Sequence, residues 1–271
     1  MSYVLLLLTG FVSAVFGSIV GLGGGIIIVP MLIYFGEYML GESISTSVAV
    51  GTSLTVLIVT ALASSVSYHK QKRIDMKSAW LFFAASGPAT IVGASLTDLF
   101  NPDTFELAFG IFMLLMAILL IARAYMKPLN IQWGIRRTFT DQKGTTYEYG
   151  YGRVSALIVG FFVGFVSGLF GIGGGSLFVP AMVLLFGYPP HVATATSMFV
   201  IFLSSLMGST AHWVQGNIHL IAALLLAPGA WLGGKTGAWI TMKMSSEVLL
   251  WVLRVTFVVV AFRMIFSGIT G

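Results

Sequence analysis

Long apolar stretches alternate with short polar connections along the whole chain, and this pattern predicts membrane-spanning helices. Each half contains four apolar segments, and they lie at about 3–35, 44–68, 77–100, 103–125, 153–187, 190–213, 217–242 and 246–268. About 20 helical residues cross the hydrocarbon core of a bilayer, so the last three segments of each half have the length of one crossing. The first segment of each half is longer and is interrupted by glycine and proline.

Composition and charge agree with a membrane protein. The chain has 271 residues, of which 57% are hydrophobic and only 8% are charged, whereas about 25% of the residues in a soluble domain are charged. The net charge of +5 comes from basic residues gathered at 70–77 and 123–153. Because both clusters lie between apolar segments, we interpret them as cytoplasmic loops and not as a nucleic-acid surface. Cysteine is absent, which excludes disulfides and cysteine nucleophiles.

A glycine-rich stretch occurs twice in the chain. GLGGGIIIVP at 21–30 and GIGGGSLFVP at 171–180 share the frame G-x-G-G-G-x-x-x-x-P. Weaker matches follow in the same order, and they pair Thr52-Ser53 with Thr196-Ser197, Pro88 with Pro228 and Gly93 with Gly233. The repetition predicts two related halves. We expect a first transmembrane repeat at 1–126, a cytoplasmic linker at 127–152 that is too polar to span a bilayer, and a second transmembrane repeat at 153–271.

The two long segments leave two topologies open. If each crosses once, each half crosses four times and the halves are parallel; if each is a re-entrant hairpin, each half crosses three times and the halves are inverted. Only the inverted arrangement puts Lys243 inside and the loop at 215–219, which lacks basic residues, outside. Because lysine and arginine favour the cytoplasmic side, the inverted repeat is favoured over the parallel one. The predicted fold class is an all-α polytopic membrane protein with this internal repeat.

The paired glycine turns are the main candidate for a binding site. The first N–H groups of a helix lack intrahelical partners and carry partial positive charge, and glycine lets the backbone approach a ligand closely. In inverted-repeat transporters, the N-termini of half-helices point at anions near the midplane. The predicted donors are Gly23, Gly24 and Gly25 in one half, and Gly173, Gly174, Gly175 and Ser176 in the other. The alternative is that these glycines only allow close helix packing.

Polar side chains inside the apolar segments are further candidates. The hydroxyls of Thr52, Ser53, Thr196 and Ser197 would coordinate a substrate oxyanion, or bond back to their own helices. Lys235 would attract an anion from within its segment, or extend its amine to the interface. His69 and His212 end the second segment of each half, where they would carry a proton or only contact water. No carboxylate lies clearly within the middle of a segment, which argues against a carboxylate proton relay.

Catalytic and metal-binding patterns are absent from the sequence. The four histidines have no metal-ligand spacing, so we expect no metal, no cofactor and no enzymatic activity. GAWLGGKT at 229–236 fits the letters of a phosphate-binding loop, but apolar segments of membrane length flank it where a strand would be required. We therefore expect no nucleotide site.

The doubled glycine frame, the Thr-Ser pair after it and the basic loop after the second segment together resemble the sulfite exporter TauE/SafE family, also called TSUP, the toluene sulfonate uptake permease family. The resemblance covers both halves and rests on Gly21, Gly23, Gly24, Gly25 and Pro30, with Gly171, Gly173, Gly174, Gly175 and Pro180. Family members are polytopic inner-membrane transporters implicated in moving sulfite, sulfonates and other small sulfur-containing anions. The linker and Lys235 belong to no family pattern that we can assign.

The resemblance implies a multi-pass protein of the cell inner membrane that transports sulfite or a related anion such as a sulfonate, thiosulfate or sulfoacetate. We expect a secondary transporter that binds the anion between the two glycine turns. A passive anion channel would use the same donors and is the alternative, while a membrane-embedded enzyme or scaffold is a third reading. The expected partners are the anion and the lipid bilayer; nucleic acid is excluded and a homo-oligomer is left open.

Overall fold

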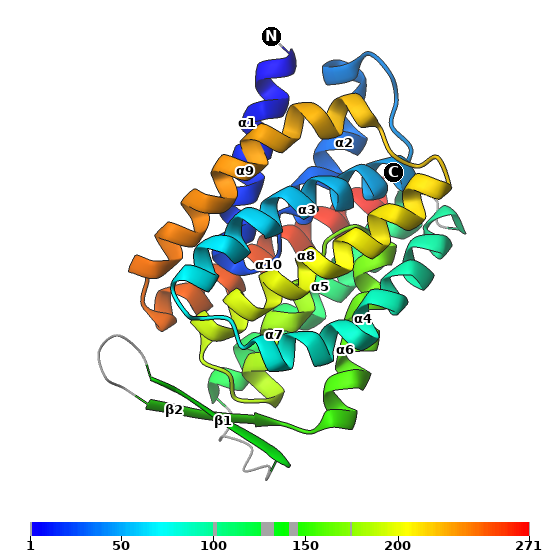
Figure 1. Cartoon of the computed structure of the whole chain (residues 1–271). Coiled ribbons are helices and arrows are strands. Elements are labelled where there is room, and N and C mark those ends of the chain that lie inside the picture. Colours follow the sequence, from blue (N-terminus) through cyan, green and yellow to red (C-terminus); the bar gives the residue numbers. More distant parts are fainter. Residues whose placement is uncertain (1, 100–101, 126–132, 141–145, 174, 271) are drawn as a thin grey trace.

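The computed structural model describes residues 2–99, 102–125, 133–140, 146–173 and 175–270, which are almost entirely helical (Figure 1). The first half contains α1 (Ser2–Val20), α2 (Gly25–Leu40), α3 (Thr46–Lys70), α4 (Met76–Leu96), the short 3-10 helix η1 (Thr97–Leu99) and α5 (Pro102–Tyr125). The second half contains α6 (Arg153–Phe170), α7 (Gly175–Leu185), α8 (Pro190–Val214), α9 (Leu220–Lys243) and α10 (Ser246–Thr270). Between the halves, β1 (Ile135–Thr140) and β2 (Thr146–Tyr151) form an antiparallel hairpin.

Seven helices in the described ranges are long and apolar enough to cross a membrane. They are α1, α3, α4, α6, α8, α9 and α10, while α2 and residues 104–115 of α5 are shorter apolar helices. Large apolar side chains such as Leu224 (70% exposed) and Phe161 (55% exposed) lie on the outside of the bundle. Such side chains are accommodated by lipid, so the prediction of a polytopic helical membrane protein is confirmed.

Glycine ends the first helix of each half. Gly21 has φ 79°, and the N–H of Leu22 donates to the carbonyl of Gly17 at 2.7 Å. Gly171 has φ 68°, and its N–H donates to the carbonyl of Ser167 at 2.9 Å. Both are helix C-caps of the kind that glycine favours, because it enters the left-handed region without steric cost. The prolines of the repeated frame lie within α2 and α7, so the breaks occur at the glycines.

The first two helices of each half run out and back. Tyr3 at the start of α1 lines the same cavity as Glu42, which follows α2, so this helix pair returns to the end at which it began. In the second half, the N–H of Gly150, just before α6, donates to the carbonyl of Phe186, just after α7, at 3.1 Å. We call the end that carries Tyr3 and Glu42 the Glu42 end, and the end that carries the β-hairpin the hairpin end. The N-terminus and the β-hairpin lie at opposite ends of the molecule (Figure 1).

Helices at equivalent places in the two halves run antiparallel. Gly51 near the start of α3 packs against His212 near the end of α8, and Thr55 and Ser209 hydrogen-bond across the helix pair at 2.8 Å. In the same way, Gly110 of α5 packs against Ile265 near the end of α10. The pairs α3 with α8 and α5 with α10 are therefore both antiparallel.

The fourth α-helix of each half packs against the first helix of the other half, so α9 lies along α1 and α4 lies along α6. Glycines at 229, 233 and 237 of α9 lie against the backbone of α1, and glycines at 160, 164 and 168 of α6 lie against the backbone of α4. A side chain at these positions would meet backbone atoms of the neighbouring helix. Small residues at such a spacing bring helices close together in membranes. The halves are therefore interlocked, and neither forms a separate helical bundle.

The β-hairpin packs over the turns at its own end of the molecule. Tyr149 donates from its hydroxyl to Asp75 Oδ2 at 3.2 Å, and its ring lies 4.1 Å from the ring of Tyr188 between centroids. Burial, followed by the nearby Asp75 carboxylate, raises the pKa of Tyr149, so the phenol remains a neutral donor at physiological pH. The linker that the sequence marks only as polar therefore contributes an ordered contact to the transmembrane helices.

Candidate anion site between the two glycine turns

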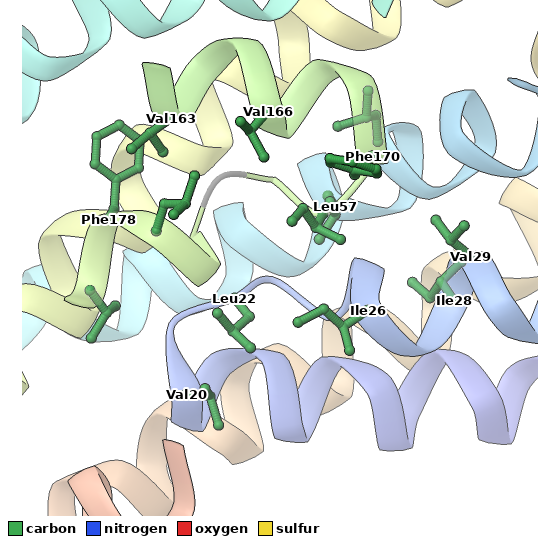
Figure 2. Close-up of a cluster of buried hydrophobic side chains, with 14 of the residues drawn as sticks. Val20, Leu22, Ile26, Ile28, Val29, Leu57, Val163, Val166, Phe170 and Phe178 are labelled. Carbon is green, nitrogen blue, oxygen red and sulfur yellow. The ribbon is translucent and has the colours of Figure 1, made fainter. Parts of the chain in front are cut away.

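The two glycine turns meet in the middle of the molecule, between α3 and α8. A Cβ atom on Gly173 would lie 2.8 Å from Ile201 Cγ2 and 3.0 Å from Leu57 Cδ1. A Cβ atom on Gly23 would overlap Leu57 Cδ2 and lie 3.4 Å from Ile201 Cγ2. Leu57 and Ile201 are fully buried, and Figure 2 shows Leu57 lying between the two turns. Equivalent glycines of the two halves thus share one pair of apolar neighbours.

Helix α2 begins at this meeting point. Gly24 has φ 100°, and its carbonyl accepts from the N–H groups of Ile27 at 3.0 Å and Ile28 at 3.2 Å. The N–H groups of Gly25 and Ile26 precede these bonds, and Gly25 lies against the backbone of Gly171 in the opposite turn. The positive end of the α2 dipole is therefore directed at the second glycine turn.

Two buried serines tie the carbonyls of the turns to α3 and α8. Ser53 Oγ donates to the carbonyl of Gly171 at 2.8 Å. Ser197 Oγ shares its proton between the carbonyl of Gly21 at 3.2 Å and that of Thr194, in its own helix, at 2.9 Å. Each serine thus binds the turn of the other half. An anion is repelled by a free carbonyl oxygen, so engaging these two oxygens makes the space between the turns more favourable for negative charge.

The neighbouring threonines contact the connections at the two ends. Thr52 Oγ1 accepts from the N–H of His219 at 2.9 Å, and Thr196 Oγ1 accepts from the N–H of Asp75 at 3.1 Å. His219 and Asp75 are themselves the N-cap residues of α9 and α4. The structure therefore brings Ser53 and Ser197 to the glycine turns, and Thr52 and Thr196 to the N-caps of the crossing helices.

Lys235 lies on the exposed face of α9 and away from the turns. Its Nζ lies 4.7 Å from the centroid of the Trp231 ring. The glycines of α9 that contact α1 and α3, among them Gly233 and Gly234, occupy other faces of the helix. This placement favours the interfacial alternative for Lys235, in which the amine extends along the outside of the bundle to water, and we leave it out of the proposed site.

If the protein transports sulfite, as the resemblance implies, replacing Lys235 with alanine should change the transport rate by no more than about twofold, the size expected for a side chain outside a binding site. The measurement is uptake by reconstituted protein, with Lys243→Ala as the matched control because Lys243 also stacks on a tryptophan of α9, at 3.7 Å. A tenfold loss that is specific to Lys235→Ala would return this lysine to the anion site.

The two histidines lie in different surroundings. His69 is exposed near the end of α3, whereas His212 near the end of α8 is fully buried. Gly174 falls outside the described residues, and so does the side chain of Ser176, whose backbone lies in the first turn of α7. No group of three His, Cys, Asp or Glu side chains that would hold a metal ion occurs within the described ranges.

The structure adds contacts at the ends that the sequence did not predict. His219 Nε2 lies 2.6 Å from Glu42 Oε1, which links the start of α9 to the connection after α2. This pair lines a cavity of about 450 Å³ together with Tyr3 and Tyr38. The two residues of this pair lie far apart in the chain, so no sequence spacing could predict their contact. The glycines of α6 and α9, by contrast, recur every four residues, and this repeat can be seen in the sequence.

Comparison with known proteins agrees with this architecture. The model of the family described as "Sulfite exporter TauE/SafE" matches residues 6–264. The chain is 46% identical over 271 residues to the probable membrane transporter protein YunE of Bacillus subtilis, covering 99% of each chain. It is 27% identical over 259 residues to a probable membrane transporter protein of Methanocaldococcus jannaschii, covering 90% of this chain and 88% of that one.

A plant relative matches over a shorter range. Sulfite exporter TauE/SafE family protein 6 of Arabidopsis thaliana is 31% identical over 91 residues, which are 34% of this chain and 21% of that protein. No solved structure matches the chain significantly. The family model covers nearly all of the sequence, from within α1 to within α10. The chain is a multi-pass membrane transporter and belongs to the sulfite exporter TauE/SafE family.

Proposed function

We propose that the protein is a secondary transporter that moves sulfite, or a related small sulfur-containing anion, across the cell inner membrane and binds it between the two glycine turns. The observation that carries this proposal is the meeting of Gly23 and Gly173 beside Leu57 and Ile201, where helix α2 begins. Backbone N–H groups at a helix start attract anions, and they do so more strongly in a low-dielectric interior.

The apolar side chains at the meeting point suit a small substrate. Leu57 and Ile201 leave the backbone N–H groups of the turns as the donors there, because the hydroxyl protons of Ser53 and Ser197 are directed at carbonyls. Three-oxygen sulfur anions present acceptors in several directions, so donors from two opposed turns would surround one anion. Movement of one half's elements against the other's would then open the site to each side in turn.

Accumulation against a gradient tests this function against the passive channel. Purified protein is reconstituted into liposomes that contain a low concentration of sulfite, the membrane potential is clamped, and labelled sulfite is followed under an imposed pH gradient. The proposal predicts net accumulation beyond that of protein-free liposomes, with sulfate, thiosulfate and methanesulfonate as competitors that define the substrate class. Flux that only equalises the two concentrations would support a channel.

We also propose that the two halves are inverted repeats and that the hairpin end is cytoplasmic. The antiparallel direction of α3 and α8 supports the inversion, because equivalent helices of parallel halves would run the same way. The out-and-back path of each long segment supports a re-entrant pair. The basic loop at 70–77 and Lys243 then share the hairpin end, as the positive-inside bias requires.

A reporter fused after Thr270 should be located outside the cell under this topology. Alkaline phosphatase at this position should be active and green fluorescent protein should be dark, because α10 runs from the hairpin end to the Glu42 end. A fusion after Ser245, which removes α10, is the matched control and should give the reverse signals. A cytoplasmic signal from the full-length fusion would support parallel halves.

A further inference from the structure

His212 and Tyr68 occupy equivalent places in the two halves. Tyr68 stands at the same distance after Thr52 as His212 stands after Thr196, and both side chains are fully buried. Tyr68 donates from its hydroxyl to the carbonyl of Ser18 at 2.8 Å. The residue of the second half equivalent to Ser18 is Gly168, and the His212 ring faces its carbonyl without a hydrogen bond of ordinary geometry.

The His212 ring is a buried polar group with unused hydrogen-bonding capacity. Neither Nδ1 nor Nε2 has a hydrogen-bond partner among the described residues. Neutral imidazole offers one donor and one acceptor, and a buried polar side chain that satisfies neither is costly and rare in proteins. The tyrosine at the equivalent position shows that this site in the fold can hold a satisfied side chain, so packing alone does not account for the histidine.

The surroundings of His212 provide one charged group, and that group is exposed to solution. Asn217 donates from its backbone N–H to the carbonyl of His212 at 2.9 Å, and from Nδ2 to both carboxylate oxygens of Asp98 at 3.3 Å. Asp98 is exposed at the Glu42 end, and its negative charge acts on the ring. Helix α3 faces the ring with Gly51, and α6 faces it with Gly168, neither of which is charged.

A second titratable pair lies at the same end. His219 and Glu42 face each other beyond Thr52, with His219 Nδ1 accepting from the N–H of Ala222 at 3.0 Å. Both ring nitrogens of His219 therefore already have partners, Nδ1 at the start of α9 and Nε2 at Glu42. Neither nitrogen of His212, by contrast, makes a hydrogen bond of ordinary geometry with the described residues.

We propose that His212 binds the proton that is coupled to anion movement, an inference that rests on the proposed transport function. The neutral imidazole takes one proton from solution at the Glu42 end and becomes an imidazolium that Asp98 stabilises. After the site has opened to the hairpin end, the imidazolium releases this proton to the solution on that side as the anion leaves there. The charge of a solvated imidazole changes near neutral pH, and burial disfavours the imidazolium, so the ring takes up the proton when the site is open to water. The proton also offsets one negative charge of the substrate.

The test compares two measurements on reconstituted protein with the membrane potential clamped. With about one pH unit across the membrane, one proton per anion supports an accumulation ratio of about tenfold. Exchange of labelled for unlabelled sulfite at equal pH requires no net proton movement. His212→Gln and His212→Tyr should lose the roughly tenfold accumulation while keeping exchange within about twofold of wild type. The tyrosine variant imitates Tyr68 and keeps an aromatic ring at this place.

His69→Gln is the matched control, because His69 is exposed at the hairpin end of α3 and should keep both activities. Wild-type accumulation in both His212 variants would overturn the proposal, and so would equal loss of exchange and accumulation in both, which indicates a structural role. A wild-type protein that exchanges sulfite but accumulates none contradicts this inference alone. A wild-type protein that moves no sulfite at equal pH contradicts the proposed function itself.

Discussion

Replacing Gly24 with valine should remove most of the folded protein. Gly24 has φ 100°, a conformation that costs a residue with a side chain about 1–2 kcal/mol and costs a β-branched residue more. Its Cβ would also lie 2.6 Å from the carbonyl oxygen of Ser13 and 2.9 Å from the carbonyl carbon. Both atoms belong to the backbone of α1, so neither can move aside without separating α1 from α2. The combined destabilisation should exceed about 4 kcal/mol.

The measurement is the yield of monodisperse protein in size-exclusion chromatography and its thermal unfolding temperature. Gly41→Val is the matched control, because Gly41 has φ 84° but a Cβ there would meet nothing within 4 Å. The control carries the backbone strain without the clash and should remain folded. If Gly24→Val and Gly41→Val have the same yield and unfolding temperature, close packing of α1 against the turn is not what Gly24 provides.

Gly23→Ala should reduce sulfite transport by at least tenfold in a protein that still folds. The added methyl group overlaps the end of the Leu57 side chain, which can shift, and its three nearest neighbours are all side-chain atoms. The shift moves the two turns apart at the place where they share Leu57 and Ile201. A displacement of about 1 Å in a binding geometry can cost about a hundredfold in rate.

Two comparisons separate this effect from general destabilisation. Gly187→Ala adds the same methyl group at φ 70° with nothing within 4 Å, and should transport at the wild-type rate. Adding Leu57→Ala to Gly23→Ala removes the overlapping side chain and should restore part of the transport. Wild-type transport by a folded Gly23→Ala protein would show that the spacing of the turns is not critical for the substrate.

The pattern of apolar segments predicted most of the helices, because a helix that crosses a membrane needs about 20 mostly apolar residues in a row. The segment predicted at 44–68, for example, corresponds to α3 at Thr46–Lys70. The interlocking of α1 with α9 and of α4 with α6 could not be predicted in the same way, since hydrophobicity does not say which helix is the partner. The glycines spaced four residues apart in α6 and α9 indicate close helix packing, but they do not identify the neighbouring helix.

The candidate site was predictable in its backbone and less so in its side chains. The duplicated glycines lie where the turns meet, because only glycine permits the positive φ of Gly21, Gly24 and Gly171 at low cost. Lys235 is different: its position within an apolar run suggested an interior cation, but the side of α9 that it occupies depends on the packing of Gly233 and Gly234. The roles of Ser53 and Ser197 depend on the opposite half, which the local sequence does not contain.

The β-hairpin was missed because the linker at 127–152 was taken as polar connection only. Side chains at 135, 137 and 139 are half-buried and alternate with exposed ones, which is the period of a strand packed on one face. Two arginines in this stretch weaken the apolar alternation, and the bilayer-facing segments on either side dominate any hydropathy profile.

Isothermal titration of sulfite into the purified protein tests most directly the central claim that the two turns form one shared anion site. The account predicts one anion per chain, with binding lost in Gly23→Ala and in Gly173→Ala alike, since a methyl group at either glycine would press on Leu57, which the two turns share. The heat should be unchanged in Gly187→Ala. Two anions per chain, or binding that survives in either turn variant, would contradict a site shared between the halves.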